Sequence, residues 1–311
     1  MSILSTARCD LYYEDSASHD PHHRQKPTIL FINGWALSGR YWQPTIEALA
    51  DACRTVTFDQ SGTGRTRFRQ HRPSFTIEGF ADEASALIEH LQLGVNAPLH
   101  IVGHSMGSMV AAELFHRYAS RAASLTIIAC GIFKYSAADL RFQMQMLATF
   151  LRATMSAKRL FKYAPLRHAF IAKAASRPIP TEYANIILED FLTVDDDAAT
   201  AVGTFSLRHD ISLRYTEHLL TANAPMCLIV GDKDRTIPPA GMITLFEKRQ
   251  LHTSAPTTFV RFPSLGHLPM LEDTPAFAGV LRQYVLQSET AAHCYDTHAS
   301  RFSKRIKRRN L

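Results

Sequence analysis

The pentapeptide at residues 103–107, Gly-His-Ser-Met-Gly, has the composition of a turn that exposes a reactive serine. It follows the apolar run Leu99–Val102, which predicts a buried strand, and a helical pattern comes after it. A strand that turns abruptly into a helix holds the serine in a strained backbone and pushes its hydroxyl out over the carboxyl edge of the sheet. An ordinary glycine-rich turn is the alternative. The strand–helix context favours Ser105 as a nucleophile for acyl transfer, with the backbone amide of Met106 facing the oxygen that becomes negative.

The elements that would position this serine alternate along most of the chain. Short apolar runs, each bounded by Gly, Pro, Asn or Asp and too short for a helix, predict strands. They are Thr28–Ile32, Thr55–Phe58, Leu99–Val102, Leu125–Ile128, Met226–Val230 and Thr258–Phe262. Helical patterns occupy Tyr41–Asp51, Thr76–Leu93, Met106–Ala119, Pro239–Gln250 and Thr274–Leu286. Continuous apolar runs indicate strands buried on both faces, so the alternation predicts an α/β fold with a doubly wound, mostly parallel sheet.

One long segment, residues 132–220, interrupts the alternation. It contains no convincing strand, its pattern is helical, and prolines such as Pro165 divide it. A structureless stretch of this length would be implausible inside a compact domain. We therefore predict a helical cap inserted into an α/β core that consists of residues 1–131 and 221–287. Residues 288–311 form a basic tail that we expect to be disordered.

The composition is that of an ordinary globular protein. Hydrophobic residues make up 46% and charged residues 20% of the 311 positions, which excludes a disordered chain, a collagen and a coiled coil. No apolar run approaches the ~18 residues of a membrane-spanning helix, and residues 1–14 lack the apolar run of a signal peptide. The five cysteines are scattered without a C-x-x-C pair, which argues against a disulfide framework or a structural zinc site. Cys130 and Cys227 lie in or beside apolar runs, so we expect reduced core thiols and a cytoplasmic location.

The net charge of +6 is unevenly distributed. Residues 288–311 hold six basic and two acidic residues, a net +4, which leaves +2 for the rest of the chain. The basic balance is therefore largely a property of the tail, and we expect no nucleic-acid partner. Contact between the tail and an anionic membrane is one interpretation, and a solvated, disordered end is favoured over it.

The serine turn and the segments around it resemble the α/β-hydrolase family over about residues 9–287. Leu11–Asp15 and Phe31–Trp35 look like the family's opening strands and its first oxyanion loop. Asp59–Gly64 looks like its aspartate-containing glycine loop, and the helical insertion corresponds to its cap. The resemblance thus implies the same α/β fold that the strand pattern predicts.

Two positions in this pattern bear on the chemistry. Most relatives carry histidine before Gly34, where this chain has Asn33. The oxyanion donor that the resemblance implies in this loop is the backbone amide of Trp35, so the mechanism survives the exchange. A serine at position 105 sets the chain apart from the family's dehalogenases and epoxide hydrolases, which use aspartate there.

The resemblance also implies an acid and a histidine that follow the nucleophile along the chain. The turn at residues 231–238 looks like the family's acid turn, whose carboxylate stands three residues after the glycine, and this points to Asp234. Asp232 is the alternative, and we expect it to be a solvated or turn-capping carboxylate. The implied base is His267, which follows the last predicted strand in a loop.

Chemically these residues form a coherent set. Ser105 would attack a carbonyl carbon while His267 accepts its proton, and Asp234 would hold the imidazole tautomer and stabilise its cation. Backbone amides of Trp35 and Met106 would stabilise the oxyanion. No metal and no organic cofactor is called for. A solvated loop is favoured over a metal site for the small histidine cluster His19, His22 and His23.

The cap segment carries aromatic and methionine side chains, some of which could line a substrate site. They are Phe133, Tyr135, Phe142, Met144, Met146, Phe150, Phe161, Tyr163 and Phe170. We expect more than half of them to pack in the cap's own core. The remainder should face the site and favour an apolar acyl or aromatic group, with Met144 and Met146 as an adaptable wall.

These residues together predict a serine hydrolase that cleaves a carboxylic ester of moderate size, with an apolar acyl or aromatic group, through an acyl-enzyme. A thioesterase and a C–C bond hydrolase of the meta-cleavage type are the nearest alternatives, because the same triad serves all three. An acyltransferase is also open, since a dry site could admit another alcohol in place of water. A non-catalytic ligand receptor on the same fold is disfavoured, because a receptor has no need of all three groups.

Overall fold

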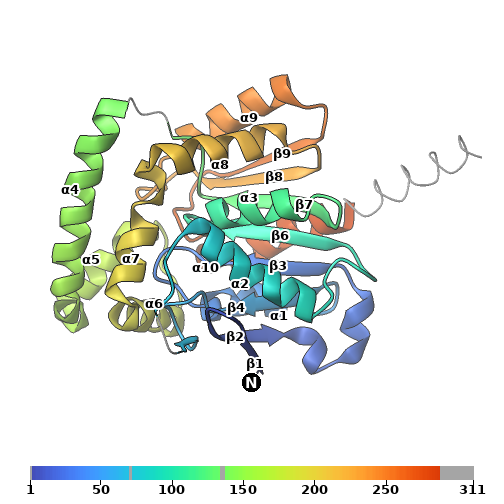
Figure 1. Ribbon diagram of the computed structural model, residues 1–311, viewed down its shortest axis with the longest axis horizontal. Helices are drawn as coiled ribbons and strands as arrows, with labels where there is room; N and C mark the ends of the chain where they lie inside the picture. The colour runs from blue at the N-terminus through green and yellow to red at the C-terminus, as the bar shows by residue number, and fades with distance from the viewer. Residues whose placement is uncertain (1, 70–71, 134–136, 288–311) are drawn as a thin grey trace, which may run out of the picture.

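The computed structural model describes residues 2–69, 72–133 and 137–287, with the backbone alone for residues 137–144. Within them one sheet has the strand order β1-β2-β4-β3-β6-β7-β8-β9, and β5 pairs with β2 (Figure 1). The parallel strands are β3 (Thr28–Ile32), β4 (Arg54–Phe58), β6 (Leu99–His104), β7 (Ala122–Ile128), β8 (Met226–Gly231) and β9 (Thr257–Phe262). Antiparallel pairing joins one edge of this set to β2 (Cys9–Asp15), and β2 to β1 (Ser2–Ser5) and β5 (Arg67–Phe68). The predicted α/β fold with a mostly parallel sheet is confirmed.

Helices cover both faces of the sheet, so the core of the molecule has three layers (Figure 1). One face carries α2 (Ile77–His90), α3 (Gly107–Arg117), α8 (His209–Thr221) and α9 (Ala240–His252), packed side by side in that order. The other face carries α1 (Gln43–Leu49), α10 (Pro269–Glu272) and a final helix at residues 274–287. Successive side chains of β3 point to opposite faces of the sheet, so the strand contributes to the apolar layers on both. Leu30 and Ile32 pack under α2 and α3, whereas Ile29 and Phe31 pack on the face that carries α1 and the final helix.

The segment between β7 and α8 is helical and forms one end of the molecule, drawn in green and yellow in Figure 1. It consists of α4 (Ala137–Ser156), η4 (Lys158–Lys162), α5 (Ala164–Ala174), α6 (Thr181–Thr193), α7 (Asp196–Gly203) and η5 (Phe205–Leu207). Residues 137–220 contain no strand. α8 packs on α3 and α9, which cover the sheet. We therefore propose that the cap ends near residue 207 and that α8 belongs to the core.

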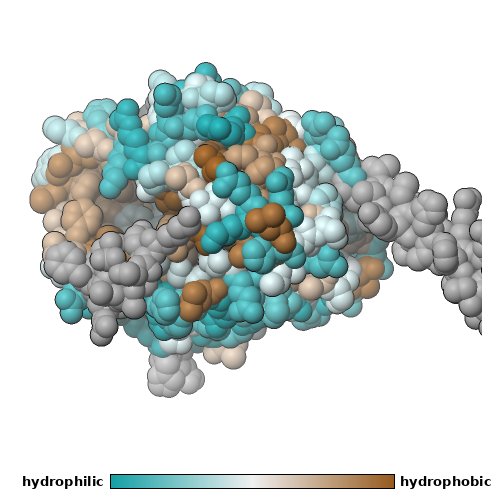
Figure 2. All heavy atoms as spheres, turned by 90° about the horizontal axis from the view of Figure 1, so that it is seen from above, coloured by the Kyte–Doolittle hydropathy of each residue, from teal (hydrophilic) through white to brown (hydrophobic). Residues whose placement is uncertain are grey.

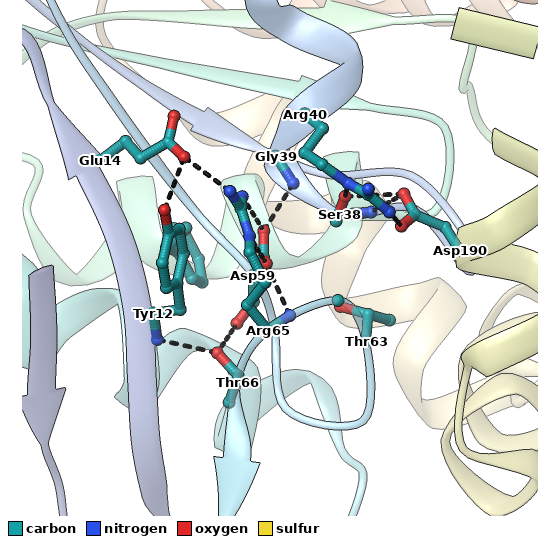
Figure 3. Close-up of polar contacts among 12 residues, drawn as sticks. Tyr12, Glu14, Ser38, Gly39, Arg40, Asp59, Thr63, Arg65, Thr66 and Asp190 are labelled. Carbon is teal, nitrogen blue, oxygen red and sulfur yellow. Dashed lines mark hydrogen bonds and ion pairs between the residues drawn. The ribbon is translucent and has the colours of Figure 1, made fainter. Parts of the chain in front are cut away.

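A polar network joins α6 of the cap to the core beside the glycine loop (Figure 3). The fully buried carboxylate of Asp190 accepts hydrogen bonds from the amide (2.8 Å) and hydroxyl (2.7 Å) of Ser38, and it forms an ion pair with Arg40. Next to it, buried Asp59 accepts a bond of 2.8 Å from the amide of Gly39 and forms an ion pair with Arg65. Each carboxylate is thus held by both an arginine and backbone N–H groups. The loop that contains Ser38, Gly39 and Arg40 is therefore fixed to α6 through Asp190 and to the glycine loop through Asp59.

The remaining sequence expectations concern membranes and thiols. None of the helices in the described ranges combines the length and hydrophobicity that crossing a bilayer requires. Cys130 and Cys227 are fully buried, as expected for core thiols, and burial raises their pKa values to about 11 and about 12. The basic tail at residues 288–311 lies outside the described residues.

Candidate active site

Ser105 occupies the sharp turn between β6 and α3. Its φ angle is +54°, a left-handed conformation that side chains other than glycine rarely adopt, and its amide donates a 2.8 Å hydrogen bond to the carbonyl of Ile128 on β7. The turn is tight enough that a Cβ atom on Gly107 would lie 2.1 Å from the carbonyl oxygen of Asn33. The strained strand-to-helix turn expected from the pentapeptide is therefore present, and it presents the serine at the carboxyl edge of the sheet.

Ser105, His267 and Asp234 form a continuous line of contacts. Ser105 Oγ lies 2.9 Å from His267 Nε2, and His267 Nδ1 lies 2.7 Å from Asp234 Oδ2. The other oxygen of Asp234 accepts hydrogen bonds from the amides of Thr236 (2.7 Å) and Ile237 (2.8 Å). All three side chains belong to residues less than 10% exposed. With Nδ1–H donated to the carboxylate, Nε2 is free to accept the serine proton.

Asp232, the alternative acid, faces elsewhere. Its two carboxylate oxygens lie 3.0 Å and 3.1 Å from Nε and Nη2 of Arg261 on β9. The carboxylate is partly exposed, in accord with the expectation of a solvated group, but it is also held in a two-point ion pair that was not foreseen. This pair ties the turn after β8 to the neighbouring strand.

The loop after β3 carries Trp35, whose backbone amide is the predicted oxyanion donor. Trp35 and Met106 both border a cavity that contains Ser105, and within the described part of the chain neither backbone amide donates to another group. Neither N–H group is therefore committed to a partner within the described chain, as the predicted oxyanion role requires. Asn33 holds this loop in place of the family's histidine, because its Nδ2 donates to the carbonyl of Phe58 (2.6 Å) and its Oδ1 accepts from Trp42 Nε1 (3.1 Å).

The imidazole of His104 links the loop after β3 to the loop that contains His267. The sequence did not predict this connection. His104 Nε2 lies 2.9 Å from the carbonyl oxygen of His267, which can only accept, so Nε2 carries the hydrogen. Nδ1 then accepts from the hydroxyl of Tyr41 (3.2 Å), which in turn accepts from the amide of Gly34 (3.2 Å). Complete burial, with His267 nearby, lowers the pKa of His104 well below its ordinary value. His104 is therefore a neutral, positioning group.

Two cavities meet at Ser105. The first, called here the Met106 cavity, has a volume of about 560 Å³ and is lined in part by Met106, Gly131, Ile132, Phe133, Leu147, Leu207 and Pro238. The second, called the His267 cavity, measures about 420 Å³ and is lined in part by His267, Leu268, Phe150, Phe161, Phe170 and Phe191. Trp35, Leu151 and Thr236 border both. Mostly apolar walls thus flank the serine hydroxyl on two sides.

The nine aromatic and methionine side chains considered for the substrate site, of which more than half were expected to pack in the cap's own core, divide into several groups. Tyr163 is 57% exposed. Phe133, Phe150, Phe161 and Phe170 line one of the two cavities. Met146 is 59% exposed and borders neither, so the expectation that it forms part of an adaptable wall is wrong. The side chains of Tyr135, Phe142 and Met144 lie outside the described residues. Phe191 on α6 was not foreseen, and its apolar periodicity with Ile187 and Leu188 is the signal that could have found it.

Metal ligation was considered for the histidines near the N-terminus. In the chain segments that the structure describes, no group of three or more His, Cys, Asp or Glu side chains is arranged to hold a metal ion. His23 is instead buried, with its Nδ1 atom 2.9 Å from the hydroxyl of Ser16.

A family model described as the alpha/beta hydrolase family matches residues 29–280, which is most of the chain. The chain belongs to the alpha/beta hydrolase family. Solved structures with the same fold include a thermophilic esterase from Thermogutta terrifontis, with a TM-score of 0.70 and 20% identity, covering 93% of this chain and 99% of that one. An enol-lactonase from Burkholderia xenovorans has a TM-score of 0.69 and 16% identity, covering 92% of this chain and all of the other.

Curated relatives are similar over shorter stretches. "Putative carbamate hydrolase RutD" from Yersinia enterocolitica is 34% identical over 107 residues, 33% of this chain and 35% of that protein. "Probable oxidoreductase EphD" from Mycobacterium tuberculosis is 27% identical over 234 residues, 69% of this chain and 39% of that protein. The chain therefore spans little more than a third of the length of the curated relatives it matches.

Proposed function

We propose that the chain is a serine hydrolase that cleaves a carboxylic ester with apolar groups on both sides of the scissile bond. The observation that carries this proposal is the hydrogen-bonded line from Ser105 through His267 to Asp234, at the junction of two apolar cavities. The proposal also accords with the esterase and the lactonase among the structures of the same fold.

The proposed reaction has two halves. Ser105 Oγ attacks the ester carbonyl carbon as His267 Nε2 takes its proton, and the carbonyl oxygen becomes an anion that the amides of Trp35 and Met106 stabilise. The bond to the leaving alcohol then breaks as His267 returns the proton to the alcohol oxygen. Water then attacks the acyl-enzyme as His267 Nε2 takes its proton. The bond to Ser105 Oγ breaks as His267 returns the proton to that oxygen, and the acid is released. Asp234 keeps Nδ1 protonated and stabilises the imidazolium in both halves.

The positions of the two cavities suggest which arm of the ester each one takes. The leaving oxygen must lie within reach of His267 Nε2, which donates the proton to it. His267 borders the cavity with four phenylalanines, so we assign the alcohol arm to the His267 cavity. The Met106 cavity lies on the oxyanion side and excludes His267 from its lining, so we assign it the acyl arm.

Other reactions share this geometry. A thioester or a C–C bond next to a carbonyl could be cleaved by the same groups, and an acyl acceptor other than water could enter the same space. The walls of both cavities contain few charged side chains among the residues described, and this favours a neutral, apolar ester. No cofactor takes part in the proposed steps.

A fluorophosphonate probe and two serine variants test the proposal. The probe should label the wild-type chain once, Ser105→Ala should abolish labelling, and hydrolysis of a chromogenic ester should fall by ~10³-fold or more. Ser206→Ala is the matched control, because Ser206 borders the Met106 cavity but lies outside the line to His267. Labelling that persists in Ser105→Ala would refute the assignment of Ser105 as the nucleophile.

Two wall variants test the assignment of the arms. Leu147→Phe narrows the Met106 cavity and should shift the preference of the enzyme toward shorter acyl groups. Ala169→Phe narrows the His267 cavity and should shift its preference toward smaller alcohols. The measurement is kcat/KM across esters in which one arm changes at a time. The opposite pairing of variant and arm would reverse the assignment while leaving the hydrolase proposal intact.

A further inference from the structure

One stretch of the cap has an unusual charge distribution. From Leu140 to Thr181 the sequence contains no aspartate and no glutamate. The same stretch carries eight basic residues, more than the net charge of +6 for the whole chain: Arg141, Arg152, Lys158, Arg159, Lys162, Arg167, Lys173 and Arg177. It builds most of α4, all of η4 and all of α5 (Figure 1), whereas most acidic residues of the cap lie on or beside α6 and α7, so the positive charge is concentrated on the part of the cap that α4, η4 and α5 form.

Most of these basic groups are not neutralised by neighbours. Lys158 pairs with Asp196, and Arg177 pairs with Asp273. In contrast, the exposed residues Arg152, Arg159, Lys162 and Lys173 make no ion pair with a carboxylate among the described residues. Arg152 borders a hollow together with Asp196 and Asp197, whereas Arg159 and Lys162 lie close together in η4. Neighbouring unpaired cations produce a local positive potential, which attracts polyanions and anionic surfaces.

Large apolar side chains are exposed in the same stretch. Met146 and Phe150 on α4, Leu160 in η4, and Tyr163 and Leu166 at the start of α5 are 41–60% exposed. Elsewhere in the described chain such side chains are exposed at widely separated positions, for example Ile3, Val95 and Leu251. Figure 2 shows apolar surface gathered at the end of the molecule where α4 lies. An apolar surface of this kind, edged with lysine and arginine, is typical of elements that lie in a membrane interface.

We propose that the surface formed by α4, η4 and the start of α5, the cap face, binds anionic lipid bilayers. Basic side chains would meet the lipid phosphates, while side chains such as Leu160 and Leu166 would enter the region between the headgroups. A soluble polyanion would also be attracted by the charges. The exposed aliphatic side chains would contribute nothing to binding a soluble polyanion, whereas they would contribute to binding a bilayer. They therefore favour a membrane as the partner.

The cap face also borders the His267 cavity. Phe150, Phe161 and Lys173 belong to the same stretch and line that cavity, which reaches Ser105. A bilayer docked on the cap face would therefore lie next to the His267 cavity, which we propose takes part of an apolar substrate. This second step, delivery of a lipid-dissolved ester, rests on the proposed function, whereas the binding itself does not.

Vesicle co-sedimentation with the full-length chain tests the binding. The protein should sediment with vesicles of phosphatidylcholine and phosphatidylglycerol, weakly or not at all with phosphatidylcholine alone, and less as salt is added. Arg159→Glu with Lys162→Glu should weaken binding by roughly 20-fold or more, from about fivefold per basic group. Arg24→Glu with Lys248→Glu makes the same charge change at exposed sites away from the cap, and it should leave binding within about twofold. Ser105→Ala should bind like the wild type, which separates binding from catalysis.

Further variants separate a membrane from a soluble polyanion. Leu160→Ser with Leu166→Ser should weaken vesicle binding and leave any heparin binding unchanged. Hydrolysis of a water-soluble ester should be equal in the wild type and in Arg159→Glu with Lys162→Glu. Hydrolysis of an apolar ester presented in anionic vesicles should fall in that variant. The proposal would be overturned if the wild type did not bind vesicles or bound only heparin. It would also be overturned if the control variant with Arg24→Glu and Lys248→Glu lost as much vesicle binding as Arg159→Glu with Lys162→Glu.

Discussion

Replacement of Asp234 by asparagine should disable the site without unfolding it. The carboxylate has two distinct sides: Oδ1 accepts the amides of Thr236 and Ile237, and Oδ2 lies 2.7 Å from His267 Nδ1. The two backbone donors require an oxygen, so the asparagine carbonyl should remain there and its NH₂ group should face His267. Nδ1 must then act as an acceptor, which leaves the hydrogen on Nε2, and Nε2 can no longer accept the proton of Ser105.

The expected loss follows from this tautomer change and from the lost charge beside the imidazolium. The same substitution in the serine-protease triad lowers kcat by ~10⁴, and we expect ~10²–10⁴ here, or about 3–5 kcal/mol of transition-state stabilisation. Because both backbone hydrogen bonds to Asp234 are kept, the melting temperature should change little. The assay is kcat on one chromogenic ester, with circular dichroism and thermal melting on the same samples.

Asp232→Asn is the matched control two residues away. It weakens the pair with Arg261, a partly exposed interaction worth ~0.2–1 kcal/mol, so kcat should stay within about threefold. If Asp232→Asn were crippled while Asp234→Asn remained near normal, the interpretation of this turn would be refuted.

Three further predictions address the oxyanion loop, a buried histidine and the tail. Trp35→Pro deletes the proposed donor and should lower kcat by ~10²–10³ with unchanged circular dichroism; a folded variant with normal kcat would remove Trp35 from the oxyanion site. Burial lowers the pKa of His100 to about 4, whereas the imidazole of an unfolded chain has a pKa of ~6.5. The unfolded state therefore binds more protons between these two pH values. The free energy of unfolding should fall by up to about 3 kcal/mol as the pH drops from ~6.5 toward 4. Urea midpoints against pH should therefore decline less steeply in His100→Asn, and equal slopes would contradict this. Deletion of residues 288–311 should leave hydrolysis of a soluble ester unchanged, whereas loss of folded protein would show that this segment packs on the body.

The central strands were predictable because burial on both faces gives each of them a continuous run of apolar residues. β3 matches the predicted run residue for residue, and the other parallel strands extend their runs by one to three residues. Such strands face apolar layers on both sides, so most of their positions are apolar or small, with exceptions such as Arg54, His100 and Arg261. β1 and β5 were missed because they lie at the antiparallel edge, where burial alternates or is slight, and polar residues such as Ser2 and Arg67 weaken the pattern.

The serine turn was predictable for a different reason. Its geometry is local: a residue at φ +54° between a strand and a helix needs small neighbours within two positions, and the sequence supplies them. The cap lacked such local constraints. A helical period indicates which residues share a face, but it does not say what that face meets. Met146 is therefore exposed where a wall was expected, whereas Leu151 and Met155 on the same helix are buried.

The contacts of His104 show what no local pattern could have revealed. Three loops, each distant from the others in sequence, meet at this one imidazole: the loop of Gly34 through Tyr41, the serine turn, and the loop of His267. The ring can hold all three only while neutral, because it must accept at Nδ1 and donate at Nε2. A protonated ring would have two donors and would lose the hydrogen bond from the Tyr41 hydroxyl. Its complete burial, which disfavours the charged form, therefore keeps the proposed oxyanion loop and the proposed base in register around Ser105.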